Sequence, residues 1–168
     1  TSTEGAIVDG GDTGGATGGA DVITTSGRLV IDAVTGVGSG AAIETTVASV
    51  DIDNATSGNI EISETDAITV FKAVQGTAGN IDIVSGGTIT VDNAGAGNAI
   101  AAAGTGTVTL DANGGTSDIL INDGILSVNG AITLTADNDV IFQADGDITS
   151  TAGAVAIAAD VDDGGATS

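Results

Sequence analysis

The sequence repeats itself at a spacing of about twenty residues, and this feature limits the available folds more than any other. Residues 58–71 read GNIEISETDAITVF and residues 79–92 read GNIDIVSGGTITVD, an offset of 21. Within the second copy, GTITVD at 87–92 returns as GTVTLD at 106–111, an offset of 19. A short and nearly constant period of strand-like segments is typical of a solenoid. The sequence therefore predicts regular coils over about 58–111.

Inside each repeat, apolar and polar residues alternate, which is the pattern of a strand with one buried face. If equivalent residues stack from coil to coil, the inward pairs are Ile60 with Ile81, Ile68 with Ile89, and Val91 with Leu110. The residues expected in the core are Ile60, Ile62, Ile68, Val70, Ile81, Ile83, Ile89, Val91, Val108 and Leu110.

No segment has a helical period, so the chain is expected to be all-β. Two architectures suit such closely spaced strands: a sandwich of antiparallel hairpins, and a right-handed parallel β-helix or β-solenoid. The repeat favours the solenoid, because only there do segments about twenty residues apart lie directly on one another. We expect a single module over 1–168 with about eight coils of roughly 19–21 residues. Asn59 and Asn80 are expected to stack at matching corners.

A second, longer repeat relates the two ends of the chain, residues 1–18 and 149–168. TSTEGA at 1–6 returns as TSTAGA at 149–154, an offset of 148, and GGAT at 14–17 returns at 164–167, an offset of 150. Either the module is repeated in tandem, or the similarity marks complementary ends of a self-assembling subunit. Both readings predict a filament in which the partner of each module is another copy, because an uncapped solenoid end exposes unpaired backbone.

The charge of the chain excludes several partners. It carries 23 acidic residues against two basic ones, Arg28 and Lys72, for a net charge of −21. Such a surface cannot neutralise phosphates, so we expect no nucleic-acid binding and no attraction to anionic membranes. No apolar run is long enough to cross a bilayer, so membrane insertion is not expected. The chain has no cysteine, and hence no disulfide.

Three segments carry a resemblance to known proteins: GNIDIVSGGTITVDNAGAGNAI at 79–100, GTVTLDANGG at 106–115 and GAITLTADNDVIFQADGDIT at 130–149. In composition and rhythm they resemble the filamentous haemagglutinin type of bacterial exoprotein and other large repetitive surface adhesins. The resemblance implies an extracellular or cell-surface β-helix that serves as adhesin, stalk or matrix fibre. It does not identify a host or matrix ligand.

Calcium is the one cofactor that the residues suggest. GGATGGADVI at 14–23 is loosely similar to the calcium-binding nonapeptide of β-rolls. Stacked carboxylates, Glu61 over Asp82 and Asp92 over Asp111, should also repel one another, and a divalent cation would relieve that repulsion. The carboxylates expected to bind calcium weakly are those of Asp12, Asp21, Glu61, Asp82, Asp92 and Asp111.

Two other function classes are known for rods of this kind: polysaccharide-acting enzymes and ice-binding proteins. Some β-helices act on polysaccharides, and the acids at 137, 139, 145 and 147 offer carboxylate pairs. The chain lacks His, Tyr and Trp, which removes His-dependent triads and aromatic sugar platforms, so no enzymatic activity and no catalytic residues are expected. The second class is ice binding, for which Thr88-Ile89-Thr90 is expected to stack under Thr107-Val108-Thr109. Thr-x-Thr also occurs at 133–135 and, as Thr149-Ser150-Thr151, near the end.

Overall fold

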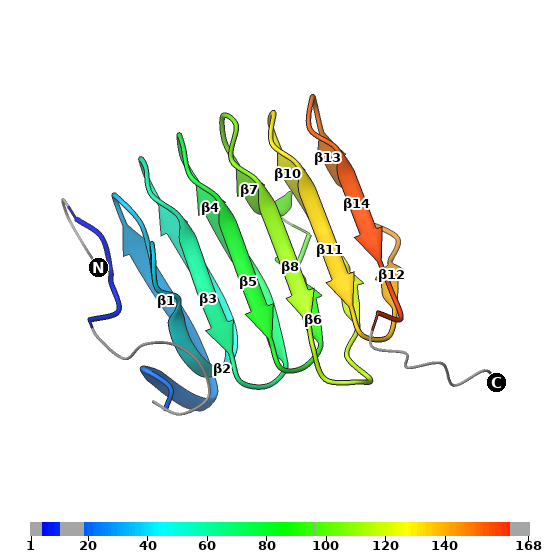
Figure 1. Ribbon diagram of the computed structural model, residues 1–168, viewed down its shortest axis with the longest axis horizontal. Coiled ribbons are helices and arrows are strands. Elements are labelled where there is room, and N and C mark those ends of the chain that lie inside the picture. The colour runs from blue at the N-terminus through cyan, green and yellow to red at the C-terminus, as the bar shows by residue number, and fades with distance from the viewer. Residues whose placement is uncertain (1–4, 11–18, 96, 162–168) are drawn as a thin grey trace.

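The protein is a parallel β-solenoid. The structure is a computed structural model that describes residues 5–10, 19–95 and 97–161. All fourteen strands in these ranges belong to one sheet and every pairing is parallel (Figure 1). No helix among the described residues could cross a membrane. The strands are β1 (Val22–Ala33), β2 (Ile43–Asn54), β3 (Ile60–Glu64), β4 (Ile68–Gln75), β5 (Ile81–Ser85), β6 (Ile89–Val91), β7 (Asn98–Ala102), β8 (Val108–Ala112), β9 (Ile119–Ile121), β10 (Gly124–Ser127), β11 (Ile132–Ala136), β12 (Val140–Phe142), β13 (Ile148–Ser150) and β14 (Val155–Ala158).

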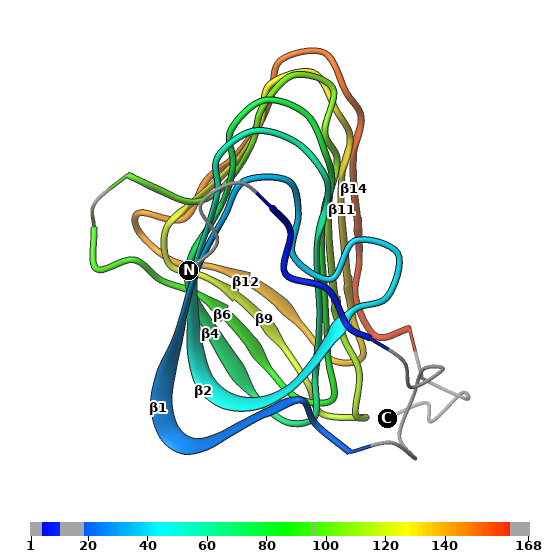
Figure 2. The same ribbon diagram turned by 90° about the vertical axis from the view of Figure 1, so that its left-hand side faces the viewer.

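Each coil contributes strands to three faces, and the cross-section is an elongated triangle (Figure 2). The first face contains β3, β5, β8, β11 and β14, the second contains β6, β9 and β12, and the third contains β7, β10 and β13. The long strands β2 and β4 turn the corners between faces: β2 pairs with β3 through residues 43–45 and with β4 through residues 49–54.

The chain makes about six coils, where the sequence had predicted eight. A ladder on the first face, which we call the first column, shows their lengths. Its members are Ile7, Val37, Ile60, Ile81, Val108, Ile132 and Val155. The 21-residue step from Ile60 to Ile81 is confirmed. The next steps are longer, because turns such as the one between β6 and β7 add residues outside the strands.

The core is made of inward columns of Ile, Val, Leu and Ala. All ten residues expected inside are buried, with Ile60, Ile81 and Ile89 fully enclosed. The expected stacks of Ile60 on Ile81 and of Ile68 on Ile89 are present. With so few aromatic side chains, this interior is filled by branched aliphatic groups that pack at high density across a narrow cross-section.

The 19-residue similarity does not mark a stack, so the expectation that Val91 lies on Leu110 is wrong. Val91 lies on Ile121 of the second face, whereas Leu110 lies on Ile83 and Leu134 of the first face. The segments 87–92 and 106–111 therefore belong to different faces. They look alike because every strand here needs apolar residues inward and Thr or Asp outward, whichever face it forms.

One corner is built on glycine. Gly58, Gly79, Gly106, Gly130 and Gly153 each lie two residues before a member of the first column, and we call them the glycine column. A Cβ on Gly79, Gly106, Gly130 or Gly153 would collide with the carbonyl oxygen of the glycine one coil before it. The coils approach so closely here that only glycine fits.

Buried polar side chains satisfy the carbonyl groups at this corner. Asn54 Nδ2 donates to the carbonyl oxygens of Ser57 and Gly58, and Ser127 Oγ lies 2.8 Å from the carbonyl oxygens of Gly106 and Gly130. Buried backbone groups without partners are costly, so these side chains fix the position of the turn. The Asn ladder expected from the sequence is also present: Asn80 N–H donates to Asn59 Oδ1 at 2.9 Å.

Candidate functional site

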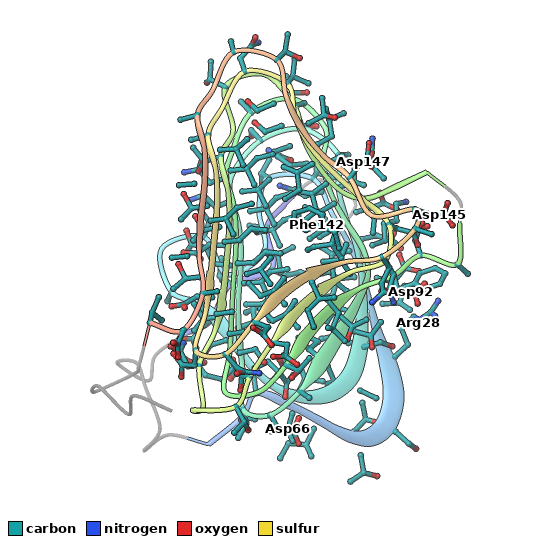
Figure 3. All side chains as sticks on the ribbon, turned by 90° about the vertical axis from the view of Figure 1, so that its right-hand side faces the viewer. Arg28, Asp66, Asp92, Phe142, Asp145 and Asp147 are labelled. Carbon is teal, nitrogen blue, oxygen red and sulfur yellow. The ribbon has the colours of Figure 1, made fainter. Side chains whose placement is uncertain are left out.

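The distinctive surface of this protein is the open end of the solenoid at β12, β13 and β14. No described strand covers these three, so inward-type side chains are exposed there. Phe142, Val155 and Ile157 are 47%, 45% and 48% exposed, although their neighbours one coil earlier, Ile121 and Ile132, are fully buried. Figure 3 looks onto this end, and Phe142 lies inside the outline of the coil. The end is therefore an apolar cross-section bordered by free strand edges.

The opposite end of the rod holds the first members of the same ladders. Ile7 is half-buried and pairs with Val37, and Leu29 of β1 is half-buried against Val50. The hydrogen bond that links consecutive members of the first column is already present here: Ile7 N–H donates to the carbonyl oxygen of Gly36 at 2.9 Å. The same bond recurs at each later step, from Val37 through to Ile132, which donates to the carbonyl oxygen of Ala154 at 2.9 Å.

The sides of the rod are acidic, and both cations are occupied locally. Arg28 lies 3.8 Å from Asp51 and 3.5 Å from the centroid of the Phe71 ring. Lys72 donates to Asp53. Phe71 is the extra residue at a register shift between β2 and β4, which places its ring beside the guanidinium. Both basic side chains therefore neutralise acids of neighbouring strands, and the sequence holds no other lysine or arginine against its 23 acids.

The six carboxylates expected to bind calcium are spread over the rod, and Asp12 lies outside the described residues. Glu61 stacks on Asp82 as expected, and both line a hollow of about 290 Å³ on the first face. Burial raises the pKa of Asp82, and the negative charges of Glu61 and Asp111 raise it further. The direction of this shift agrees with the repulsion expected between stacked acids, although burial is its largest cause.

Asp92 does not stack on Asp111, which corrects another expectation. Asp111 lies between Val84 and Thr135 on the first face. Asp92 follows β6, where Ala94 N–H donates to its Oδ1 at 2.9 Å and Asn122 Nδ2 donates to its Oδ2 at 3.2 Å. These donors hold the pKa of Asp92 below its ordinary value.

Asp21 takes part in a carboxylate cluster that the sequence did not reveal. The ligand atoms of Asp9, Asp21 and Glu44 lie within 4.8 Å of one another. Asp21 Oδ2 also accepts a hydrogen bond from Glu44 N–H at 3.2 Å, which ties it to β2. Carboxylate oxygens at such separations are the ligands that Ca²⁺ prefers, so these three residues could hold a divalent cation. Asp9 and Asp21 lie twelve residues apart in the first coil and Glu44 lies in the next coil, so no local motif joins the three.

The acids weighed for sugar hydrolysis also fall into different places. Asp137 caps a turn: its Oδ2 accepts from Gly114 N–H and Gly115 N–H, which lower its pKa. Asp145 and Asp147 line a hollow of about 440 Å³ together with Asp123, beside the turn that follows β6 (Figure 3). Asp123 is buried and accepts a hydrogen bond from Asn93 N–H at 2.7 Å, so it holds that turn in place.

The threonine columns expected for ice binding do not form. Ile89 pairs with Ile119 and Val108 pairs with Ile81, which puts the two Thr-x-Thr segments on different faces. Outward threonines stack only in short runs along the described ladders. On the second face Thr69 lies on Thr90, and the next member of that column is Leu120. On the first face Thr109 lies between Asp82 and Thr133. A flat, repeated array of hydroxyl groups is therefore absent from these described faces.

Comparison of the chain with protein-family models, with curated proteins and with solved structures gave no match.

Proposed function

We propose that this protein is a structural module of a secreted or cell-surface bacterial filament, stalk or adhesin, in which rods join end to end into a fibre. The observation that carries the proposal is the open apolar end at β12, β13 and β14, where Phe142, Val155 and Ile157 are exposed. Solenoids that act as single units need a terminal repeat with a polar outer face, because an apolar cross-section promotes association.

The distribution of charge gives this association a direction. The sides carry most of a net charge of −21, and like-charged sides repel. The open end presents the side chains of the core instead. Contact between two rods is then favourable along the axis and unfavourable from the side. Such a rod lengthens without bundling.

The mechanical role follows from the ladders. In a parallel solenoid the backbone hydrogen bonds run along the axis, so tension is carried by many parallel bonds in each coil. A module of six coils adds about 29 Å to the axis, since neighbouring strands are about 4.8 Å apart. Its place outside the cell follows from the resemblance to surface exoproteins, and the fibre's own ligand is left open.

Three copies joined by flexible Gly/Ser linkers of about twenty residues test the proposal. Linkers of this kind raise the effective concentration of the ends to the millimolar range without dictating how they meet. Small-angle X-ray scattering is expected to show one straight rod about three modules long. Chains that behave as three independent beads would contradict the proposal.

A matched pair of variants connects the result to the open end. Phe142→Glu puts a charge on the apolar cross-section and is expected to convert the rod into beads. Ile141→Glu places the same charge on the same strand but on the outward column shared with Leu120, and is expected to leave the rod intact. Equal effects of the two variants would show that the open end is not the contact.

A further inference from the structure

The two ends of the rod occupy equivalent places in the coil, and this bears on how modules join. Ile7 and Val155 are the first and last members of the first column, six steps apart. Gly5 and Gly153 each lie two residues before them, at the position of the glycine column. The offset between these pairs is 148, which is also the offset that relates TSTEGA at 1–6 to TSTAGA at 149–154.

The offset of 148 residues between the similar segments equals a whole number of coils. An offset that did not equal a whole number of coils would have placed the two similar segments in different columns or on different faces. Instead Gly5-Ala6-Ile7 and Gly153-Ala154-Val155 are similar in sequence and lie in the same column. Their hydrogen bonds are complementary: Ile7 N–H donates to the carbonyl oxygen of Gly36 in the coil that follows it, and the carbonyl oxygen of Ala154 accepts from Ile132 N–H of the coil before it. The repeat of the sequence is thus also a repeat of the rod.

The other two faces hold one member fewer. The column on the second face runs from Leu29 through Val50, Val70, Val91 and Ile121 to Phe142. The column on the third face runs from Ile31 through Ile52, Ala73, Ile100 and Ile125 to Ile148. Among the described residues each of these columns has six members, whereas the first column has seven. The segment at Ile7 and strand β14 at Val155 are therefore alternative occupants of one place in a longer rod.

Two intact copies cannot stack flush for this reason. If Ile7 of a second copy lay on Val155 of the first, the second and third faces would each lack a strand at the joint. A gap of about 4.8 Å, one strand spacing, would open over Phe142 and Ile148. If instead Ile7 of the second copy takes the place of Val155, then Leu29 falls on Phe142 and Ile31 falls on Ile148, and every column continues.

We infer that successive modules share one coil, so that residues 5–10 of one module occupy the place of residues 153–158 of the module before it. The rod then repeats every 148 residues and six coils as one continuous chain. The occupant of the open end is a second copy, with Leu29 and Ile31 covering Phe142 and Ile148. This inference rests on the proposed function, and it adds the register of the joint.

The joint is tested in a chain of two copies, in which Ile148 of the first is followed directly by Thr1 of the second. The chain has no cysteine, so engineered pairs are read without background. An outward column on the second face supplies the positions: Arg28, Ser49, Thr69, Thr90, Leu120 and Ile141. In the proposed register, Ile141→Cys of the first copy and Arg28→Cys of the second lie on adjacent strands, within reach of a disulfide.

Two further pairs calibrate the measurement. The first control pair is Leu120→Cys and Ile141→Cys in the same copy. These two positions lie on adjacent strands, so they give the disulfide yield of a true neighbour pair. Leu120→Cys of the first copy with Arg28→Cys of the second would be two strands apart, about 10 Å, which is too far for a disulfide. Under mild oxidation, mass spectrometry is expected to give the joint pair a yield close to the first control and at least tenfold above the second.

The outcomes separate the inference from the proposed function. A joint pair that crosslinks no better than the pair two strands apart overturns the shared coil. If linked copies still form straight rods in that case, the filament proposal stands and the modules meet in another register. The copies joined by Gly/Ser linkers could behave as beads while the joint pair still crosslinks in the directly fused chain. In that case the shared coil stands, and the association of separate rods through their ends is excluded.

Discussion

The middle of the rod and its open end carry the same kinds of side chain in the same columns, yet they differ in burial. Ile81 and Val108 in the middle of the first column are fully buried, whereas Val155 at its end is 45% exposed. Sequence and local conformation are alike in the two regions. The difference comes only from whether another coil follows, so in a solenoid burial is a property of the neighbours and not of the strand.

The largest expected effect that tests this comparison is a buried charge. Ile81→Asp places a carboxylate in the core with no cation nearby, and is expected to lower the free energy of unfolding by more than about 4 kcal/mol, or to prevent folding. Val155→Asp in the same column can reach solvent and is expected to lower it by about 1–2 kcal/mol. Denaturant unfolding followed by circular dichroism measures both. Equal losses would mean that the end coil is as enclosed as the middle.

A smaller effect is expected at the glycine column. Gly106→Ala brings a methyl group against the carbonyl oxygen of Gly79, with coils fixed on both sides. Overpacking of this kind is expected to lower the free energy of unfolding by about 1–3 kcal/mol. Gly153→Ala makes the same collision with Gly130, but the last coil is free to move away, so a smaller loss is expected. A loss at Gly153 as large as that at Gly106 would show that the end coil is rigidly held.

Glu64 provides a test that depends on pH. It is buried in the inward column that also contains Thr45 and Ser85, where Thr45 Oγ1 donates to its Oε2 at 2.7 Å. Desolvation raises the pKa of Glu64 above 4.5 in the folded state. The folded protein then binds more protons than the unfolded chain, so this contribution to stability is present below pH 4.5 and is lost as pH rises through the raised pKa.

The variant Glu64→Gln removes that titration. The difference in unfolding free energy between the natural protein and the variant is expected to fall as pH rises from 4 to 7. Urea unfolding at several pH values measures it. A difference that does not change with pH would show that burial does not shift this carboxyl group.

The smallest expected effect concerns the stacked acids on the side of the rod. Asp82→Asn removes one charge between Glu61 and Asp111, and is expected to raise the midpoint of thermal unfolding at pH 7 by about 1–3 °C. The gain should shrink in 1 M salt, because screening weakens repulsion between exposed charges. A gain that is unchanged by salt would point to a cause other than charge.

Much of the fold was visible in the sequence. Alternation identified the inward residues, and the GNI segments at 58 and 79 identified one true coil. Gly-x-Ile or Gly-x-Val precedes six of the seven members of the first column, at 5, 58, 79, 106, 130 and 153. The motif also occurs at 87 and 146, where the Ile lies on another face, so it does not identify the glycine corner by itself. The similarity between 87–92 and 106–111 was misleading, because strands of different faces share the same inward and outward pattern.

The candidate site was predicted less completely, for the same physical reason. Asp9 and Asp21 of the first coil lie close to Glu44 of the next coil, and Asp92 and Asp111 separate onto different faces. The lengths of the turns decide such pairings, and through them the length of a coil varies between 21 and 30 residues without disturbing the strands. No local pattern encodes them.

The sequence by itself determined which residues point inward, which positions are glycine, and that a segment is repeated after 148 residues. Those features depend on the backbone and on side-chain polarity, which act within a few residues. Only the tertiary structure decided how many coils form, which strands lie on one another, and that Ile7 and Val155 hold the same place in the coil. Stacking depends on where each turn brings the chain back to the rod, and this is settled by packing against the previous coil.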